Sequence, residues 1–413
     1  MKLADIVDVF IAGDWGNESL SNDTPNAVFC IRGADIMSIR DHKYTDIPKR
    51  YISKRAKETK LLKVGDLVIE KSGGSPIQST GRITYISEDL IQAKKELVCS
   101  NFSIGIRVKS RWNPLYVYYY WQYIYNLGVF FNFESKTSGI KNLQLDSALE
   151  AIAIEEIPLE VQNQIVATLS SYDHKIALNR AINHNLVAMA KQLYDYWFVQ
   201  FDFPNEDGKP YKSNGGKMVW NEKLKREIPE GWEVIPLFEG IDVQYGFPFS
   251  TDSFLEETTD VPIVRIRDII NGTISAYSTE KIDEKFKLKK GDIVVGMDGN
   301  FHMNYWHTDK AYLNQRCVRL RPKKDSSISS IQIYYDIQPF IKAKEKSLKG
   351  STVGHLLDKD LKELYILNSN TNLRNIFDYI LLKILTGKIE YETLTKQRDE
   401  LLPLLMNGQA RIG

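Results

Sequence analysis

The sequence predicts an α+β fold in which two similar globular α/β domains are joined by an antiparallel two-helix coiled coil, so that the chain carries a pseudo-two-fold internal repeat. Three observations predict this fold. A Lys-x-Gly-Asp motif followed by a β-branched run occurs twice, at residues 62–74 and 288–300. A long heptad pattern follows each copy, and a stretch rich in Gly, Pro and polar residues, 202–229, separates the two halves.

Short segments recur in the same order in both halves. Gly65 corresponds to Gly291 inside the motif, where Gly-Asp before an apolar run is typical of a turn into a strand. Residues 31–36 (IRGADI) resemble residues 266–269 (IRDI). Several matches in order indicate a duplicated unit. We predict five segments: domain 1 (1–155), the first coil helix (156–201), a wet linker (202–229), domain 2 (230–370) and the second coil helix (371–413).

Each half ends in apolar residues spaced four and three apart, the pattern of a coiled-coil seam. Polar or small residues interrupt it, among them Asn183, Gly387 and Arg398. Each stripe could also be an amphipathic helix packed on its own domain. Two helices of similar length favour pairing, and an antiparallel pair needs no long return of the chain. The predicted seam residues are Ile165, Leu169, Tyr172, Ile176, Leu186, Leu193, Phe377, Ile380, Ile384, Leu394, Leu401 and Leu405.

Composition narrows the classes of function. The net charge is +1, so any anion-binding surface must be local. The chain has three cysteines and no CxxC pair, which favours a reducing cytoplasm over a disulfide or zinc framework. The most apolar run, 115–131, is short for a membrane span and contains polar residues. No phosphate-binding loop, dinucleotide fingerprint or metal-ligand spacing occurs, so we expect no catalytic residue, cofactor or metal in this chain.

One short segment leaves an enzymatic alternative open. Residues 113–116 (NPLY) differ by one residue from the Asn-Pro-Pro-Tyr of amino-methyltransferases, in which the Asn side chain holds the target amine. The alternative is an adenine methyltransferase acting on its own. No glycine-rich cofactor strand precedes the segment, and a turn that leads into the aromatic helix is the favoured interpretation.

Local basic runs lie beside loops with polar tips. The run 40–63 has nine bases and three acids, and lysines recur at 281–290 in the second half, which favours a phosphate-tracking surface. The loops 70–82 and 296–316 share a scaffold but differ in side chains, as readers of two short double-stranded DNA sequences would. The predicted DNA-binding residues are Arg32, Lys71, Ser72, Ser75, Gln78, Arg82, Lys136, Thr137, Ser138, Arg267, Asn300, His302, Asn304, Gln315, Arg316, Lys349, Ser351 and His355.

Three stretches resemble the specificity subunits of Type I restriction-modification systems: the first helix from IPLEVQNQIVATLSSYDHK onward, the segment GKPYKSNGGKMVWNEKLKREIPEGWEVIPL, and the C-terminal RDELLPLLMNGQARI. The resemblance covers the whole chain. It implies that each half is a target-recognition domain for one part of a bipartite DNA site and that the coiled coil sets the unread gap.

The resemblance also implies partners. Two modification subunits carrying S-adenosylmethionine would dock along the helices and methylate adenine N6, and restriction subunits that translocate DNA with ATP and Mg²⁺ would complete a prokaryotic defence complex. This chain would bind no cofactor and would lie in the cytoplasm. A third class of function remains open, a coiled-coil scaffold that joins two protein-binding domains.

Overall fold

The computed structural model describes residues 1–75, 77–137, 140–347, 354–369 and 373–410. The chain forms two compact units: unit 1, Met1–Ala177 with Thr393–Gly413, and unit 2, Leu178–Glu392. Each unit therefore takes part of both long helices, whereas the sequence placed each helix in a segment of its own. The predicted α+β fold with an internal repeat is confirmed by the arrangement of sheets described below.

Unit 1 contains ten strands and five helices of its own among its described residues. The strands are β1 (Val7–Ala12), β2 (Asn26–Ile31), β3 (Lys49–Ile52), β4 (Leu67–Glu70), β5 (Ser72–Gly73), β6 (Ile83–Tyr85), β7 (Leu97–Cys99), β8 (Ser103–Val108), β9 (Glu134–Thr137) and β10 (Ile140–Leu143). The helices are α1 (Asp35–Arg40), α2 (Lys54–Lys60), α3 (Glu88–Lys94), α4 (Pro114–Asn126) and α5 (Leu145–Ala151).

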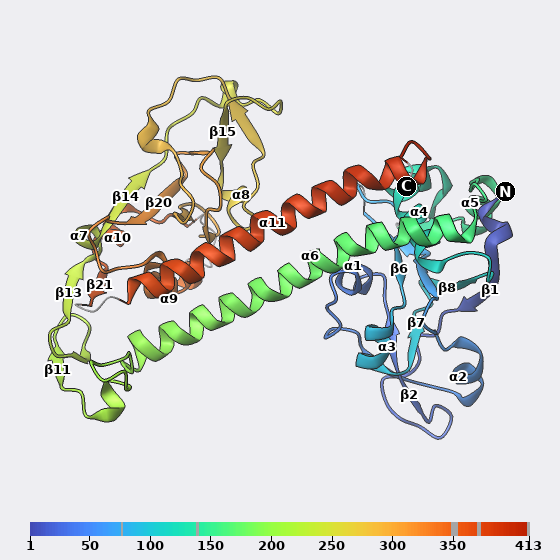
Figure 1. Ribbon diagram of the computed structural model, residues 1–413, viewed down its shortest axis with the longest axis horizontal. Coiled ribbons are helices and arrows are strands. Elements are labelled where there is room, and N and C mark those ends of the chain that lie inside the picture. Colours follow the sequence, from blue (N-terminus) through green and yellow to red (C-terminus); the bar gives the residue numbers. More distant parts are fainter. Residues whose placement is uncertain (76, 138–139, 348–353, 370–372, 411–413) are drawn as a thin grey trace. The chain divides into compact units, whose positions relative to one another are not determined.

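Two sheets form the globular part of unit 1 (Figure 1). One is antiparallel with the order β1-β8-β4-β6, and the other has the order β3-β2-β7 with β2 and β7 parallel. Side chains alternate along β4 as a strand between two layers requires. Leu67 and Ile69 face a core shared with α4, and Val68 faces a second core shared with Leu97. A third sheet of unit 1 has the order β5-β10-β9.

Unit 2 repeats this plan with different loop lengths. Its strands are β11 (Met218–Asn221), β12 (Arg226–Pro229), β13 (Glu233–Pro236), β14 (Ile241–Tyr245), β15 (Val261–Val264), β16 (Ala276–Ser278), β17 (Ile293–Gly296), β18 (Met303–Tyr305), β19 (Tyr312–Leu313), β20 (Cys317–Pro322) and β21 (Tyr365–Asn368). Its own helices are α7 (Leu237–Gly240), α8 (Ile266–Ile269), α9 (Ser330–Ser347) and α10 (Asp358–Lys362).

The two units have the same strand order. The sheet β14-β20-β17-β18 matches β1-β8-β4-β6, and β16-β15-β19 matches β3-β2-β7, again with one parallel pair. The alternation is also repeated, because Ile293 and Val295 face the core with α9 and Val294 faces the other core. The duplication predicted from short sequence matches is therefore a duplication of topology.

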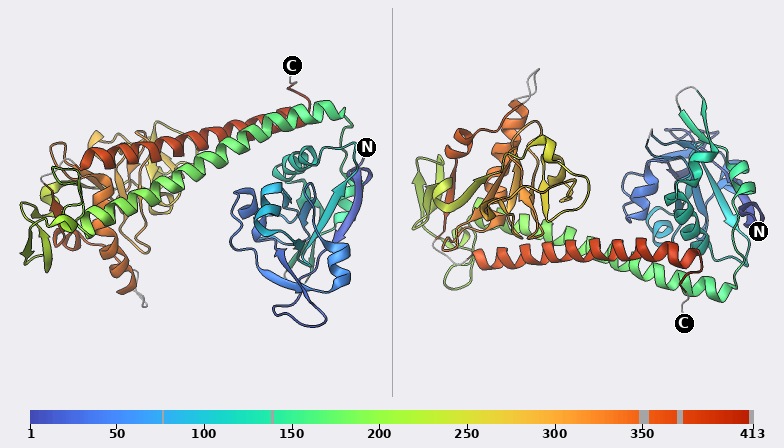
Figure 2. Two further views of the ribbon diagram at one scale, coloured as in Figure 1. Left: turned by 60° about the horizontal axis from the view of Figure 1, so that its bottom comes forward. Right: turned by 90° about the horizontal axis from the view of Figure 1, so that it is seen from above.

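Two long helices, α6 (Leu159–Tyr194) and α11 (Arg374–Met406), belong in part to each unit. Within each unit a stretch of α6 lies beside a stretch of α11 (Figure 2). In unit 1, Arg398 Nη1 on α11 donates to Asp173 Oδ1 on α6 at 2.7 Å. In unit 2, Asn183 Nδ2 on α6 donates to the Ile384 carbonyl on α11 at 3.1 Å. Early α6 residues thus meet late α11 residues and the reverse, as the predicted antiparallel pairing requires.

The predicted seam residues all lie on α6 or α11 and are buried or half-buried. Buried ones are Ile165, Leu169, Ile176, Phe377, Ile380, Ile384 and Leu405, and half-buried ones are Tyr172, Leu186, Leu193, Leu394 and Leu401. The Arg398 interruption is explained by Asp173, which also accepts a hydrogen bond from the Tyr119 hydroxyl at 2.6 Å. That carboxylate joins α4, α6 and α11 within unit 1.

The segment 202–229 is more ordered than the predicted wet linker. It contains the hairpin β11–β12, and the Phe203 ring stacks on Trp232 with 4.7 Å between ring centroids. Phe201 and Ile228 are buried in the same cluster. Aromatic side chains after the end of α6 therefore join this segment to a core of unit 2 that also contains Trp197 and Phe377. The Gly and Pro content gave no sign of this packing.

Candidate nucleic-acid interface

Loops that follow several strands converge at one edge of each unit, because the parallel strands β2 and β7, or β15 and β19, end side by side. We call this the loop edge. It comprises residues 13–16, 32–34, 71–75 and 100–102 in unit 1, and residues 246–248, 265–267, 297–302 and 314–316 in unit 2.

The backbone of the loop edge is the same in both units. A Cβ on Gly13 would lie 2.0 Å from the Ser100 carbonyl oxygen, and one on Gly246 would lie 1.9 Å from that of Asn314, so both places require glycine. The Lys71 amide donates to the Phe102 carbonyl at 2.8 Å, and the Met297 amide donates to the Arg316 carbonyl at 2.9 Å. These contacts make residue-by-residue comparison possible.

The Gly-Asp motif stabilises the strands that lead into the loop edge. Asp66 receives two hydrogen bonds from the Arg107 guanidinium, both at 2.8 Å, and the pKa of Arg107 is raised by this bonding. Asp292 receives the same pair from Arg321, at 2.6 and 2.7 Å. Each buried carboxylate also accepts the backbone amide three residues before it, which closes the turn. The repeated motif is therefore structural, and it fixes the strands that carry the loops.

The structure corrects the register of one repeated segment. Arg32 donates from its amide to Asp35 Oδ2 at 2.8 Å, and Arg265 donates in the same way to Asp268 at 2.9 Å. The counterpart of Arg32 is therefore Arg265, whereas the sequence comparison chose Arg267. Arg267 is exposed, at the position equivalent to Ala34 on the loop edge.

Several predicted DNA-binding residues have partners inside their own unit. Arg32 donates through its guanidinium to Asp35, and Arg82 and Asn304 are bonded as follows. Arg82 donates through Nε and Nη2 to Glu70, whose side chain is 2% exposed, and this bonding raises the pKa of Arg82. Asn304 donates to the carbonyls of Ile269 and Ile270 at 3.1 and 2.8 Å. These contacts argue against base contacts by Arg82 or Asn304.

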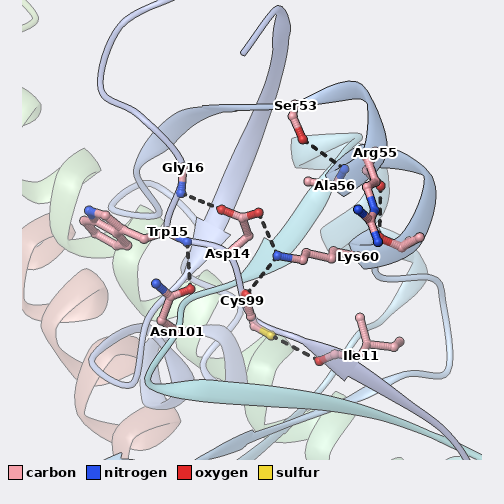
Figure 3. Close-up of polar contacts among 12 residues, drawn as sticks. Ile11, Asp14, Trp15, Gly16, Ser53, Arg55, Ala56, Lys60, Cys99 and Asn101 are labelled. Carbon is pink, nitrogen blue, oxygen red and sulfur yellow. Dashed lines mark hydrogen bonds and ion pairs between the residues drawn. The ribbon is translucent and has the colours of Figure 1, made fainter. Parts of the chain in front are cut away.

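The loop edge of unit 1 contains a pocket of about 480 Å³. Its wall includes Trp15, Arg32, Ser72, Asn101 and Phe102. Figure 3 shows how the loop that carries Trp15 is held: the Trp15 amide donates to Asn101 Oδ1 at 3.2 Å, and Lys60 pairs with Asp14 at 2.9 Å. An apolar pocket with a few polar groups at its rim is a common form of ligand site.

The loop edge of unit 2 is charged at the equivalent place. Asp298 Oδ1 lies 2.6 Å from His355 Nδ1, and Asp298 Oδ2 pairs with Arg316 Nη1. The side chains of Arg316 and His355 are 59% and 52% exposed, whereas that of Asp298 is 19% exposed. The carboxylate therefore holds two donors that face solvent.

The remaining predicted residues differ in exposure. Gln78, Asn300 and Gln315 are exposed, and Lys71, Ser72, Ser75 and His302 are half-buried. For Lys136 and Thr137 the structure describes the backbone in β9. Ser138, Lys349 and Ser351 lie outside the described residues.

Three edge residues were missed by the sequence analysis, namely Asn101, Phe102 and Asp298. The repeat itself holds the signal for two of them. Gln315 and Arg316 were predicted in the second half, and the backbone equivalence places Asn101 and Phe102 at the same positions in the first. Part of the basic run 40–63 is also paired internally, because Lys57 bonds Glu96 and Lys60 bonds Asp14.

The structure confirms the favoured interpretation of residues 113–116. Asn113 Oδ1 accepts hydrogen bonds from the amides of Leu115 and Tyr116 at 2.9 and 3.4 Å, so it caps α4. Tyr116 is buried in the core of unit 1. Among the residues that the structure describes, no three His, Cys, Asp or Glu side chains gather as metal ligands do. None of the described helices is both long enough and apolar enough to cross a membrane.

Comparison with known proteins decides the family. The model of the Type I restriction modification DNA specificity domain matches residues 1–187 and 229–367, one segment for each loop edge. This chain belongs to that family. As a specificity-domain protein it resembles the Type I restriction enzyme MjaIX specificity subunit of Methanocaldococcus jannaschii, with 25% identity over 64% of this chain and 62% of that protein.

A second curated relative agrees with this specificity-domain assignment. The Type I restriction enzyme EcoBI specificity subunit of Escherichia coli is 29% identical over 33% of this chain and 28% of that protein. The match thus spans under two thirds of the length of each of these relatives. In fold, the chain is similar to the crystal structure of a Type I restriction-modification S subunit from M. genitalium, with a TM-score of 0.55, 16% identity, and coverage of 98% of this chain and 95% of that one.

Proposed function

We propose that this specificity-domain chain is the DNA-reading subunit of a Type I restriction-modification complex and that each loop edge reads one half of a bipartite site. The observation that carries the proposal is one scaffold built twice, with the same buried Asp–Arg support and different side chains at the tips. One scaffold with two sets of loop side chains suits the reading of two different short DNA sequences. Contacts to base edges determine which sequence is bound, and contacts to the DNA backbone position the protein on the duplex.

The helices α6 and α11 set the unread gap between the half-sites. They have 36 and 33 residues, or roughly 50 Å at 1.5 Å per residue. Half-sites on one face of B-DNA are centred about 34–36 Å apart. A helix pair of this length is sufficient to hold two readers at such a spacing.

Two modification subunits dock on the helices, and restriction subunits complete the complex. An apolar stripe on α6 in unit 2 supports this part of the proposal: Leu178, Ile182 and Met189 are 53%, 46% and 44% exposed. Leu178 and Ile182 are four residues apart, and Ile182 and Met189 are seven apart, so these three residues share one face of the helix. Exposed apolar surface of this kind is typical of a protein-binding site.

The chemistry lies with the partners. In this proposal the modification subunits carry S-adenosylmethionine and methylate adenine N6, the restriction subunits use ATP and Mg²⁺, and this chain binds no cofactor and catalyses no step. The side chain of Asn113, which a methyltransferase would need for its target amine, is used to cap α4. Three buried free cysteines are compatible with assembly in the reducing cytoplasm.

A map of methylated adenines tests the proposal. The chain is co-expressed with its modification subunit in a host that lacks adenine methylation, and N6-methyladenine is located across the genome. We expect a bipartite motif with a constant unread gap, and no such motif when this chain is omitted. A motif that does not depend on this chain, or no methylation by an assembled complex, would favour a scaffold that joins proteins.

A further inference from the structure

Three matched positions at the loop edges carry different chemistry in the two units. The amide of Leu143 donates to the Lys71 carbonyl at 2.7 Å, and the amide of Leu356 donates to the Met297 carbonyl at 2.8 Å. With the matched contacts of Phe102 and Arg316 above, the backbone aligns three pairs of side chains. The pairs are Ser72 with Asp298, Phe102 with Arg316, and Asn142 with His355.

A change in packing beneath these positions supports the alignment. In unit 1 a Cβ on Gly33 would lie 2.6 Å from Glu70 Oε1, so the acid fills the space above the glycine. In unit 2 the large and small residues exchange places, because Ile266 occupies the position of Gly33 and Gly296 that of Glu70. A Cβ on Gly296 would lie 3.1 Å from the Ile266 side chain. The two pairs of residues fill one space in opposite ways, as aligned positions do.

The triplet in unit 2 is built to present a fixed guanidinium. Asp298 pairs with Arg316 through Oδ2 and with His355 through Oδ1, and the side chains of Arg316 and His355 are both more than half exposed. An Arg has five N–H donors, so pairing with a carboxylate leaves others for a ligand. The arrangement suits a planar acceptor pair, because an Arg fork with a fixed orientation can bond guanine O6 and N7 together.

The triplet in unit 1 offers no charge. The Ser72 hydroxyl donates to Asn142 Oδ1 at 2.5 Å, and Phe102 is 59% exposed on the wall of the pocket that also contains Trp15. An aromatic ring at the edge of a base-reading surface can contact the thymine methyl group. Where unit 2 has an arginine fork, unit 1 therefore has an exposed aromatic ring.

We propose that these matched triplets determine one base pair in each half-site: Asp298, Arg316 and His355 require a G·C pair, and Ser72, Phe102 and Asn142 require an A·T pair read through thymine. The inference rests on the proposed function and adds the class of base that each unit reads. The competing view is that Arg316 and Asp298 form an ordinary surface ion pair, worth little and without effect on sequence choice.

Methylome maps of variants test the inference. Arg316→Ala and Arg316→Lys are each co-expressed with the modification subunit, and Lys225→Ala, a 72% exposed lysine of β11–β12, serves as the charge-matched control. We expect both Arg316 variants to lose selection at one G·C position of one half-site, by about 5- to 150-fold, the equivalent of about 1–3 kcal/mol at 1.4 kcal/mol per tenfold. The other half-site and the gap stay unchanged, as does the whole motif of the control.

Transfer of the unit 2 triplet into unit 1 distinguishes a change in base preference from a failure of the variant to fold. Replacing Ser72, Phe102 and Asn142 with Asp, Arg and His should introduce a G·C requirement into the other half-site, at a position that was A·T. Wild-type motifs in both Arg316 variants, or a graft that methylates the original sequence, would overturn the inference while leaving the bipartite motif intact. Absence of a bipartite motif from the wild-type chain would instead overturn the proposed function.

Discussion

The Asn183 side chain occupies the space that a Cβ on Gly387 would fill. Asn183 Oδ1 lies 2.5 Å from that position, and Nδ2 donates to the Ile384 carbonyl. Glycine in a helix interior costs about 1 kcal/mol relative to alanine. The glycine of α11 and the asparagine of α6 are therefore one feature of the helix pair, although each alone looks like an interruption of its heptad pattern.

This contact predicts strong coupling between two substitutions. Gly387→Ala should give no stabilisation in the wild-type chain, because the new methyl group displaces the Asn183 amide. In an Asn183→Ala background the same change should stabilise by about 1 kcal/mol, the difference in helix propensity. Thermal unfolding of the four proteins measures the coupling. Equal effects of Gly387→Ala in both backgrounds would show that the two residues act independently.

A buried carboxyl in unit 2 predicts a dependence of stability on pH. Burial is the largest influence on Asp336 and raises its pKa to about 6, although hydrogen bonds from Tyr194 and Gln332 act in the opposite direction. In the unfolded chain the pKa is near 4. Folding therefore takes up a proton between about pH 4 and pH 6, so this contribution is complete below pH 4 and is lost as the pH rises through 6.

Asp336→Asn removes this titration. Relative to the wild type, the variant should gain on the order of 2–3 kcal/mol in free energy of unfolding between pH 4.5 and pH 7.5. Unfolding midpoints of both proteins across that range provide the comparison, which cancels the other carboxyls. A constant difference between the two proteins would show that Asp336 ionises in the folded chain as freely as in the unfolded one.

Substitution of Arg82 tests whether this residue stabilises the fold or contacts a DNA base. Arg82→Met would leave the Glu70 carboxylate buried without its partner, and we expect a loss of about 3–5 kcal/mol in stability. Adding Glu70→Gln should recover part of it, because the unpaired charge is then absent. Calorimetry measures both variants. An unchanged unfolding midpoint together with weaker DNA binding would return Arg82 to the role that the sequence predicted.

The exposed stripe on α6 predicts a failure of assembly without a loss of stability. Ile182→Glu with Met189→Glu should abolish association with modification subunits, because charge enters an apolar contact. The unfolding midpoint of the free chain should stay the same, since both side chains are exposed. Leu20→Glu, at a 64% exposed residue outside the helices, is the matched control. Masses of the purified complexes report the result, and full assembly of the double variant would place the docking surface elsewhere.

Local patterns predicted the framework well. The Lys-x-Gly-Asp turn is visible in sequence because its chemistry is local: Gly65 and Gly291 have φ near +93°, and each following Asp accepts an amide three residues back. The heptads were equally visible. Each of these two signals is formed by residues that are only a few positions apart in the sequence, so neither depends on contacts between distant segments.

Long-range pairing limited the prediction of the edge. Arg82 reads as a surface base until β4 and β6 pair and bring Glu70 beside it. Asp298 has no local sign of its role because Arg316 and His355 reach it from distant segments. The register of Arg32 failed for a different reason. The letters Ile-Arg occur at 31–32 and at 266–267, but only Arg265 precedes its Asp by three residues, as Arg32 does.

The most direct test of two readers on a fixed spacer is the methylated motif of a chain with lengthened helices. Four residues, about 6 Å of helix, are inserted after Ala177 in α6 and after Glu392 in α11, where the compact units meet in sequence. We predict that both half-sites stay unchanged while the unread gap grows by one or two base pairs, at about 3.4 Å each. An unchanged gap in a chain that still methylates would contradict it.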